Sequence, residues 1–120
     1  MQYVFLEYSI DCAHWLPFVP DGHKCGNMHG HRYDIRLEIE GEPDRETGWI
    51  IDYADIKTIA DPIIMALDHK TLNEIGGLTN PTCEHIALYL SECLQPKLPE
   101  LSKIEVRETD RAGAGWRAKR

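Results

Sequence analysis

Two histidines separated by a single glycine, His29 and His31, are the residues in this sequence best suited to chemistry. On a β-strand, side chains two residues apart point to the same face and lie roughly 6.6 Å apart along the chain. Their imidazoles can therefore converge on one ion, at metal–nitrogen distances of about 2.0–2.1 Å. Two half-buried histidines that are each hydrogen-bonded would have the same spacing, so the pair alone does not establish a metal site.

A third histidine, His14, extends the apolar face of an earlier alternating segment. An adjacent strand would bring it within reach of His29 and His31, which share the parity of the apolar residues that follow them. An unpaired polar ring on an apolar face is costly, so each of the three histidines there needs a partner. Three neutral histidines and one open position are typical of catalytic zinc sites. The sequence therefore predicts a Zn²⁺ ion held by His14, His29 and His31.

Cys25 lies four residues before His29, in a polar loop that is rich in glycine. A thiol beside a divalent cation loses its proton more readily, so Cys25 could act as a base or a nucleophile near neutral pH. Cys25 could instead be a buried free cysteine or a fourth zinc ligand. A fourth protein ligand would make the site structural, and the spacing does not distinguish these interpretations.

Two acidic groups outside the histidine cluster are also candidates. Glu108 shares the parity of the apolar residues in a C-terminal strand, so its carboxylate needs hydrogen-bond donors. A ligand with two adjacent N–H groups would supply them, as would Arg111 or Arg117.

The Asp68-His69 pair follows the first expected helix. His69 either complements the helix C-terminus as a cation or moves a proton while Asp68 orients it.

The elements that would position these residues follow from hydrophobic periodicity. Alternation predicts four strands, over residues 2–12, 31–40, 102–109 and 112–118. Helical spacing predicts one helix after the N-cap Asp52 and another that starts near Asn80. Pro62 should kink the first helix or split it in two, and residues 17–30 should form a long loop. The order predicts one α+β domain over residues 1–120, with two helices on one face of a four-stranded antiparallel sheet.

Composition excludes several classes of protein. The chain has 42% hydrophobic and 28% charged residues, as in ordinary globular domains. Its formal net charge of −7 argues against a nucleic-acid partner. The longest apolar run, residues 63–67, is far too short to span a membrane. The absence of a signal-peptide pattern and of any Cys-x-x-Cys pair leads us to expect a cytoplasmic protein with reduced thiols.

Several of these motifs together resemble those of the 6-pyruvoyltetrahydropterin synthase superfamily. The resemblance is carried by residues 13–14, 25–31 and 67–69. Three further stretches are most similar to its bacterial branch, the 6-carboxy-5,6,7,8-tetrahydropterin synthases of queuosine biosynthesis. These stretches are residues 23–26, 48–52 and 80–82. The Cys-x-x-x-His-Gly-His spacing itself is shared by the carboxy and pyruvoyl branches.

The resemblance implies a role for each candidate residue. The zinc ligands of the family fall on His14, His29 and His31. Its catalytic cysteine falls on Cys25, its Asp-His pair on Asp68 and His69, and its pterin-anchoring glutamate on Glu108. Residues of a neighbouring subunit around Thr82 and Glu84 would complete the pterin pocket.

The resemblance also implies a fold, an assembly and a reaction. The tunnelling fold joins the sheets of three subunits into a barrel, and two trimers stack into a homohexamer. The implied reaction converts 7,8-dihydroneopterin triphosphate to 6-carboxytetrahydropterin, with release of acetaldehyde and triphosphate. Two alternatives stay open, namely elimination of triphosphate as in the pyruvoyl branch and a zinc-stabilised binding module without turnover.

Overall fold

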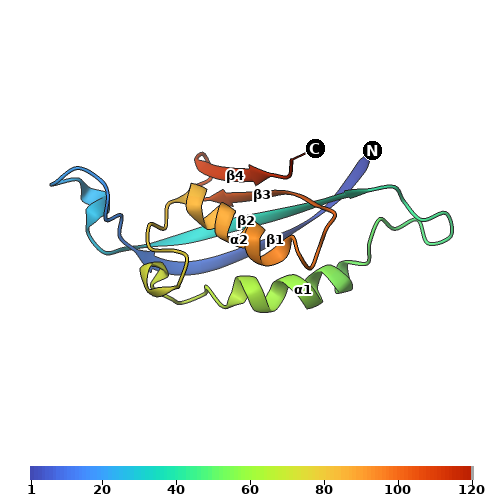
Figure 1. Ribbon diagram of the computed structural model, residues 1–120, viewed down its shortest axis with the longest axis horizontal. Coiled ribbons are helices and arrows are strands. Elements are labelled where there is room, and N and C mark those ends of the chain that lie inside the picture. Colours follow the sequence, from blue (N-terminus) through green and yellow to red (C-terminus); the bar gives the residue numbers. More distant parts are fainter. Residues whose placement is uncertain (120) are drawn as a thin grey trace.

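The computed structural model describes residues 1–119, and it confirms an α+β chain with a four-stranded antiparallel sheet (Figure 1). The strands follow the sheet order β1-β2-β3-β4, which is also their order in the chain. The elements are β1 (Gln2–His14), β2 (His29–Gly41), α1 (Tyr53–Met65), α2 (Cys83–Leu94), β3 (Leu101–Arg107) and β4 (Gly113–Arg117). Two single 3₁₀ turns, η1 (Lys24–Gly26) and η2 (Leu72–Glu74), complete the fold.

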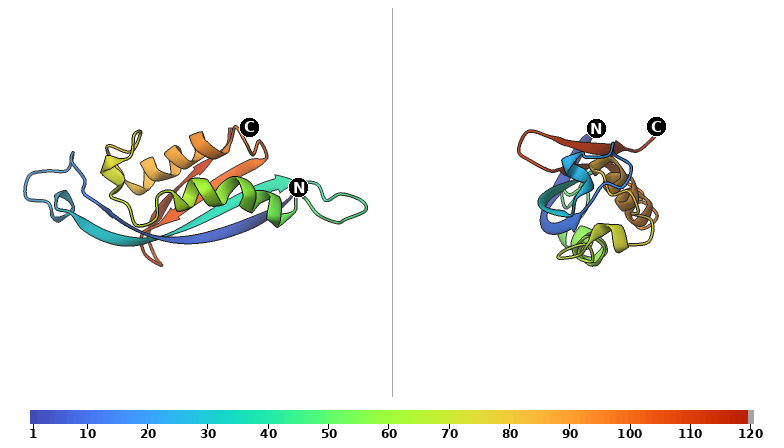
Figure 2. Two further views of the ribbon diagram at one scale, coloured as in Figure 1. Left: turned by 90° about the horizontal axis from the view of Figure 1, so that it is seen from below. Right: turned by 90° about the vertical axis from the view of Figure 1, so that its left-hand side faces the viewer.

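Both helices cover the same face of the sheet (Figure 2). The core lies between these two layers, because alternate strand residues meet the apolar stripe of each helix. Strand β2 shows the alternation, since every second residue from Tyr33 to Ile39 is at most 1% exposed, namely Tyr33, Ile35, Leu37 and Ile39. The opposite face of the sheet carries the charged residues, and the sheet therefore has one apolar and one polar side.

Each helix begins where a side chain caps its first turn. The Asp52 carboxylate accepts a hydrogen bond from the Ala54 N–H at 2.9 Å, and the Thr82 hydroxyl accepts one from His85 at 3.1 Å. Of the two effects expected of Pro62, a split of the first helix is wrong, because α1 continues through Pro62 to Met65. A single missing N–H near the C-terminus is tolerated where the buried side of the helix is held by packing against the sheet.

The register of the β1–β2 hairpin places the histidines opposite one another. Strand β2 begins at His29, two residues earlier than the alternation predicts, and His14 pairs directly with His29. Cys12 pairs with His31 in the same register. Directly opposed residues in antiparallel strands have Cβ atoms about 4.5–5.5 Å apart. The hairpin alone therefore brings the three histidines together.

A short segment after α1 covers one part of the outer edge of β1, which the sequence pattern does not predict. The His69 N–H donates to the Asp11 carbonyl at 2.7 Å, and the Ala13 N–H donates to the Lys70 carbonyl at 3.0 Å. Thr71 forms an isolated parallel bridge with Ala13. Within residues 1–119, no backbone group pairs with the same edge over residues 3–9, so that part of the edge remains open.

Candidate active site

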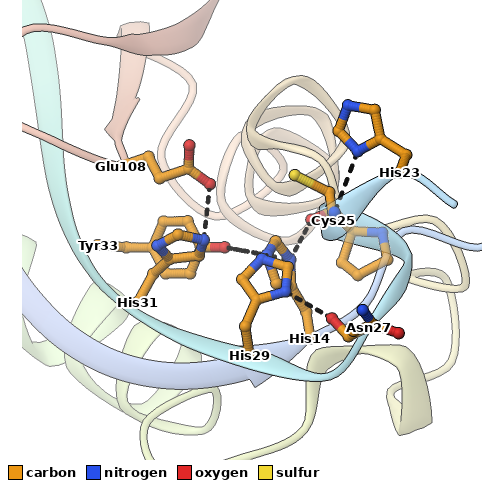
Figure 3. A network of polar contacts seen from close by, with 9 residues as sticks. His14, His23, Cys25, Asn27, His29, His31, Tyr33 and Glu108 are labelled. Atoms are coloured by element: carbon orange, nitrogen blue, oxygen red, sulfur yellow. Dashed lines mark hydrogen bonds and ion pairs between the residues drawn. The ribbon is translucent and has the colours of Figure 1, made fainter. Parts of the chain in front are cut away.

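Three histidine side chains converge at the end of the β1–β2 hairpin (Figure 3). The Nε2 atoms of His14 and His29 are 3.0 Å apart. One potential ligand atom from each of His14, His29 and His31 lies within 4.8 Å of the other two. Two nitrogens bound to one tetrahedral ion at 2.0–2.1 Å lie roughly 3.3 Å apart, so the separation between His14 and His29 suits a single metal ion.

The hydrogen bonds of the other ring nitrogens support the same conclusion. The Nδ1 atom of His14 lies 2.9 Å from the Pro81 carbonyl, and Nδ1 of His29 lies 2.6 Å from the Asn27 carbonyl. A carbonyl only accepts, so each ring carries its proton on Nδ1 and presents a lone pair on Nε2. Two facing lone pairs repel at 3.0 Å, and a cation between them would remove that repulsion. These histidines therefore fit a bound metal ion.

His14 lies deepest in the cluster, with 2% of its surface exposed. Burial lowers the pKa of His14, with smaller contributions in the same direction from His29 and His31. A histidine must be neutral to bind a metal, so this shift favours the ligating form. The fully buried Tyr33 lies beneath His14, with its hydroxyl 3.2 and 3.3 Å from the two ring nitrogens. Burial raises the pKa of Tyr33, so its hydroxyl stays protonated.

Glu108 lies at the edge of the histidine cluster, one residue beyond the end of β3. Its Oε1 atom is 3.0 Å from Nε2 of His31, and 36% of its side chain is exposed. Its N–H donates to the Ala112 carbonyl at 3.0 Å, which fixes the turn. Among residues 1–119 no ion pair links Glu108 to Arg111 or Arg117, the alternative partners considered from the sequence. The carboxylate is thus held beside the histidines and remains accessible to a ligand.

Cys25 lies in the loop between β1 and β2, and its side chain is partly buried. Neither the Cys25 sulfur nor the Glu108 carboxylate belongs to the group of mutually close ligand atoms found among residues 1–119. The Cys25 carbonyl accepts a hydrogen bond from the Leu16 N–H at 2.8 Å, which ties the loop to the end of β1. The geometry therefore favours three histidine ligands and an open position over a closed four-ligand site.

A second thiol, Cys83, begins α2 and is also partly buried. Burial raises the pKa of Cys83 to about 12, and the carboxylates of Glu108 and Glu84 add to the rise. Cys83 therefore stays protonated at neutral pH. The same turn contains Pro81, whose carbonyl contacts His14, and Thr82, whose hydroxyl caps α2. Glu84 is exposed in the first turn of α2, so Thr82 and Glu84 lie at the start of this helix, beside the Pro81 carbonyl that contacts His14.

Asp68 and His69 lie three and four residues beyond the end of α1. Nε2 of His69 is 3.5 Å from the Asp68 carboxylate, whose other oxygen accepts from the Asp11 N–H at 2.9 Å. His69 has a positive φ of 60° and a side chain that is 79% exposed. A surface hollow of about 520 Å³ is lined by both His31 and His69. No hydrogen bond or ion pair within residues 1–119 joins His69 to Cys25.

Comparison with known proteins identifies the family. Residues 3–119 match the 6-pyruvoyl tetrahydropterin synthase family. The chain belongs to this family. A curated relative from Synechocystis sp., 6-carboxy-5,6,7,8-tetrahydropterin synthase, is 34% identical over 97% of this chain and 93% of its own length. The dihydroneopterin monophosphate aldolase of Pyrococcus furiosus is 32% identical over 85% of this chain and 82% of its own length.

The fold of the 6-pyruvoyl tetrahydropterin synthase family is also found among solved structures. The Caenorhabditis elegans 6-pyruvoyl tetrahydropterin synthase superposes with a TM-score of 0.85 at 26% identity, and the match covers 99% of this chain and 98% of that chain. Members of the family are lyase-type pterin enzymes. Over residues 1–119, neither α1 nor α2 is long and apolar enough to cross a membrane. The family confirms the resemblance identified from the sequence motifs.

Proposed function

We propose that this protein is a zinc-dependent 6-carboxy-5,6,7,8-tetrahydropterin synthase in queuosine biosynthesis. The reaction takes up water and converts 7,8-dihydroneopterin triphosphate to 6-carboxytetrahydropterin, acetaldehyde and triphosphate. The similarity to the Synechocystis relative over nearly the whole length of both chains supports this branch of the family. The unpaired state of all four cysteines suits a protein of the reducing cytoplasm.

The observation that carries the proposal is the position of a carboxylate beside three converging histidines. Glu108 is 3.0 Å from His31 and comes from a strand end far along the chain. A purely structural zinc site requires neither an open coordination position nor a partly exposed carboxylate at its edge. The same arrangement suits an enzyme that anchors a heterocycle at the carboxylate and presents the substrate side chain to a metal. The zinc-stabilised binding module is therefore the weaker interpretation.

The ring of the substrate is held by Glu108 in this proposal. A pterin presents an amino group and an adjacent ring N–H on one edge, and a carboxylate accepts both hydrogen bonds at once. His14, His29 and His31 would hold the zinc ion, which when bound supplies a Lewis acid to the side-chain hydroxyls of the substrate. Tyr33 contacts the His14 ring through its hydroxyl and its own ring, and this packing supports the orientation of His14 in the proposed site.

Proton transfer is assigned to Cys25 and to the Asp68-His69 pair. Cys25 acts as a thiolate base on the substrate side chain. His69, which Asp68 orients at 3.5 Å, relays a proton to or from the reacting carbons. Because no hydrogen bond or ion pair joins His69 to Cys25 among residues 1–119, we propose that the exposed His69 serves the active site of a neighbouring subunit.

Association of subunits also follows from the sheet edges. Unpaired edge strands must be covered or paired, and both β1 over residues 3–9 and β4 present such edges. We propose that β1 of one subunit pairs with β4 of the next, that three sheets close a barrel, and that two trimers form a homohexamer. Thr82 and Glu84 would then contribute to a pterin pocket shared between two subunits.

Product analysis tests the proposed reaction. The zinc-loaded protein is incubated with 7,8-dihydroneopterin triphosphate, and every product is identified by mass spectrometry. We expect 6-carboxytetrahydropterin, acetaldehyde and triphosphate in equal amounts. Triphosphate without a carbon fragment would instead identify the pyruvoyl reaction. An aldehyde fragment that still carries phosphate would identify an aldolase reaction.

Glu108→Gln should weaken pterin binding about tenfold to a hundredfold and leave zinc content unchanged. The amide of glutamine offers one acceptor and one donor group. One of the two contacts with the pterin edge would therefore place the amide N–H group against an N–H group of the pterin. Leaving a buried group unpaired costs about 1–3 kcal/mol, which corresponds to roughly that loss of affinity. Calorimetric titration of a pterin product analogue into both proteins, with zinc measured in parallel, checks this. Equal affinities would place the pterin pocket elsewhere.

A further inference from the structure

The loop that carries Cys25 is held in place by hydrogen bonds and not by burial. No residue from 15 to 28 is buried, and Phe18 is 78% exposed. A segment with few buried contacts opens locally at low free-energy cost, so each hydrogen bond matters more there than in the core. A thiol that acts as a base must nevertheless be held accurately, because misplacement by about 1 Å can cost about a hundredfold in rate.

Three contacts hold Cys25 in this loop in addition to the backbone bonds of η1, in which the Gly26 N–H donates to the His23 carbonyl at 3.0 Å and the Asn27 N–H to the Lys24 carbonyl at 3.2 Å. The Cys25 carbonyl accepts from the Leu16 N–H at 2.8 Å, two residues beyond His14. Two residues after Cys25, the Asn27 carbonyl accepts a hydrogen bond from the His29 ring at 2.6 Å. The third contact is made by a side chain, because the Cys25 N–H donates to Nδ1 of His23 at 3.0 Å (Figure 3). Within residues 1–119, His23 is the one loop residue whose side chain forms a hydrogen bond with the Cys25 backbone.

The His23 imidazole occupies the N-cap position of the 3₁₀ turn η1. A capping side chain accepts a hydrogen bond from one of the first free N–H groups of the turn, a role that Asn, Asp or Ser usually fills. An Nδ1 atom that accepts must carry a lone pair, so this contact suits the His23 tautomer with its proton on Nε2. Figure 3 shows the ring on the backbone side of Cys25, while the sulfur points away from it.

We propose that His23 is a positioning residue for Cys25, and that its Nδ1 cap fixes the backbone from which the thiol reaches the substrate. The catalytic part of this inference rests on the proposed role of Cys25 as the base. Because the pterin ring is anchored at Glu108 and the zinc ion at the histidines, loss of the cap should alter kcat much more than KM or zinc content. Asparagine can restore an acceptor at the cap, whereas alanine cannot.

The test compares His23→Ala, His23→Asn and the wild-type protein, with Asp44→Ala as a matched control. Asp44 caps another exposed turn by accepting from the N–H groups of Glu46 and Thr47 at 2.8 and 3.0 Å. That turn lies at the opposite end of the molecule (Figure 1). Amide hydrogen exchange of residues 23–28, zinc content, kcat and KM are measured for each protein.

For His23→Ala we expect exchange at the Cys25 amide to be about fivefold faster, as loss of a typical cap implies. The kcat value should fall at least about tenfold, with KM changed less than about threefold. His23→Asn should restore both the exchange rate and kcat, and Asp44→Ala should change neither.

Two results would overturn the inference. Unchanged exchange at Cys25 in His23→Ala would show that the cap does not hold the loop. Equal impairment of His23→Asn and His23→Ala would show that the imidazole acts in some way other than as an acceptor. Exchange is measured without substrate, so a wild-type protein that does not turn over dihydroneopterin triphosphate would refute the proposed function while leaving the test of the cap intact.

Discussion

Cys25→Ala is expected to lose nearly all turnover while it retains its zinc and its fold. The proposed base is removed, and general acid–base groups typically contribute about 10²- to 10⁴-fold to the rate. Zinc should stay bound, because the cluster of ligand atoms found within residues 1–119 consists of three histidines without the Cys25 sulfur. Steady-state kinetics, metal analysis and circular dichroism of the variant check the three parts of this expectation.

The matched control for this variant is Cys93→Ala, which removes a partly buried thiol from the C-terminal end of α2. It should retain turnover, because Cys93 has no part in the proposed chemistry. A Cys25→Ala protein that has lost its zinc and its structure would show that Cys25 is a fourth ligand. The site would then be structural, and the binding-module interpretation would replace the enzyme.

His31→Ala should reduce the zinc content from about one ion per chain to a small fraction of that value. Even loss of a group that merely orients a ligand typically costs about 10- to 100-fold in metal affinity, so loss of a ligand itself should cost more. Turnover should fall with the zinc content, and added zinc should restore at most a part of it. Metal analysis after dialysis against a weak chelator, followed by kinetics with added zinc, makes the measurement.

His85→Ala provides the control for the loss of one histidine. His85 is exposed, and its Nδ1 lies 2.8 Å from the Asn80 carbonyl. It therefore shares a ring contact to a backbone carbonyl with His14 and His29, but it lies outside the group of close ligand atoms. The control variant should keep its full zinc content. Undiminished zinc in His31→Ala would contradict the assignment of the metal site.

Side-chain parity predicted much of the site, because the period of a strand decides which residues share a face. His14, His29 and His31 could be assigned to one apolar face in this way, and so could Glu108 at the end of β3. The pairing of β1 with β2 then follows from a hairpin whose two strands have matched apolar faces. The α+β architecture could be predicted for the same reason, since helices and strands have different hydrophobic periods.

Contacts made by backbone groups and loops could not be predicted from residue types. The Pro81 carbonyl that orients His14 and the His23 cap on Cys25 depend on the path of irregular segments, which no periodicity describes. Tyr33 shares the parity of His31, but the alternation of apolar residues does not predict that its hydroxyl contacts His14. The course of α1 through Pro62 was decided by tertiary packing, which overrides local propensity.

The three histidines all belong to one local hairpin, and this has a consequence for the order in which the protein folds. His14 and His29 are 15 residues apart in the chain, whereas His14 and Pro81 are 67 apart. Contacts between residues close in sequence form with less loss of chain entropy and earlier than distant ones. The three histidines can therefore assemble before α2 and β3 have docked, and a metal ion captured at that stage would hold the hairpin closed while the rest of the chain packs onto it.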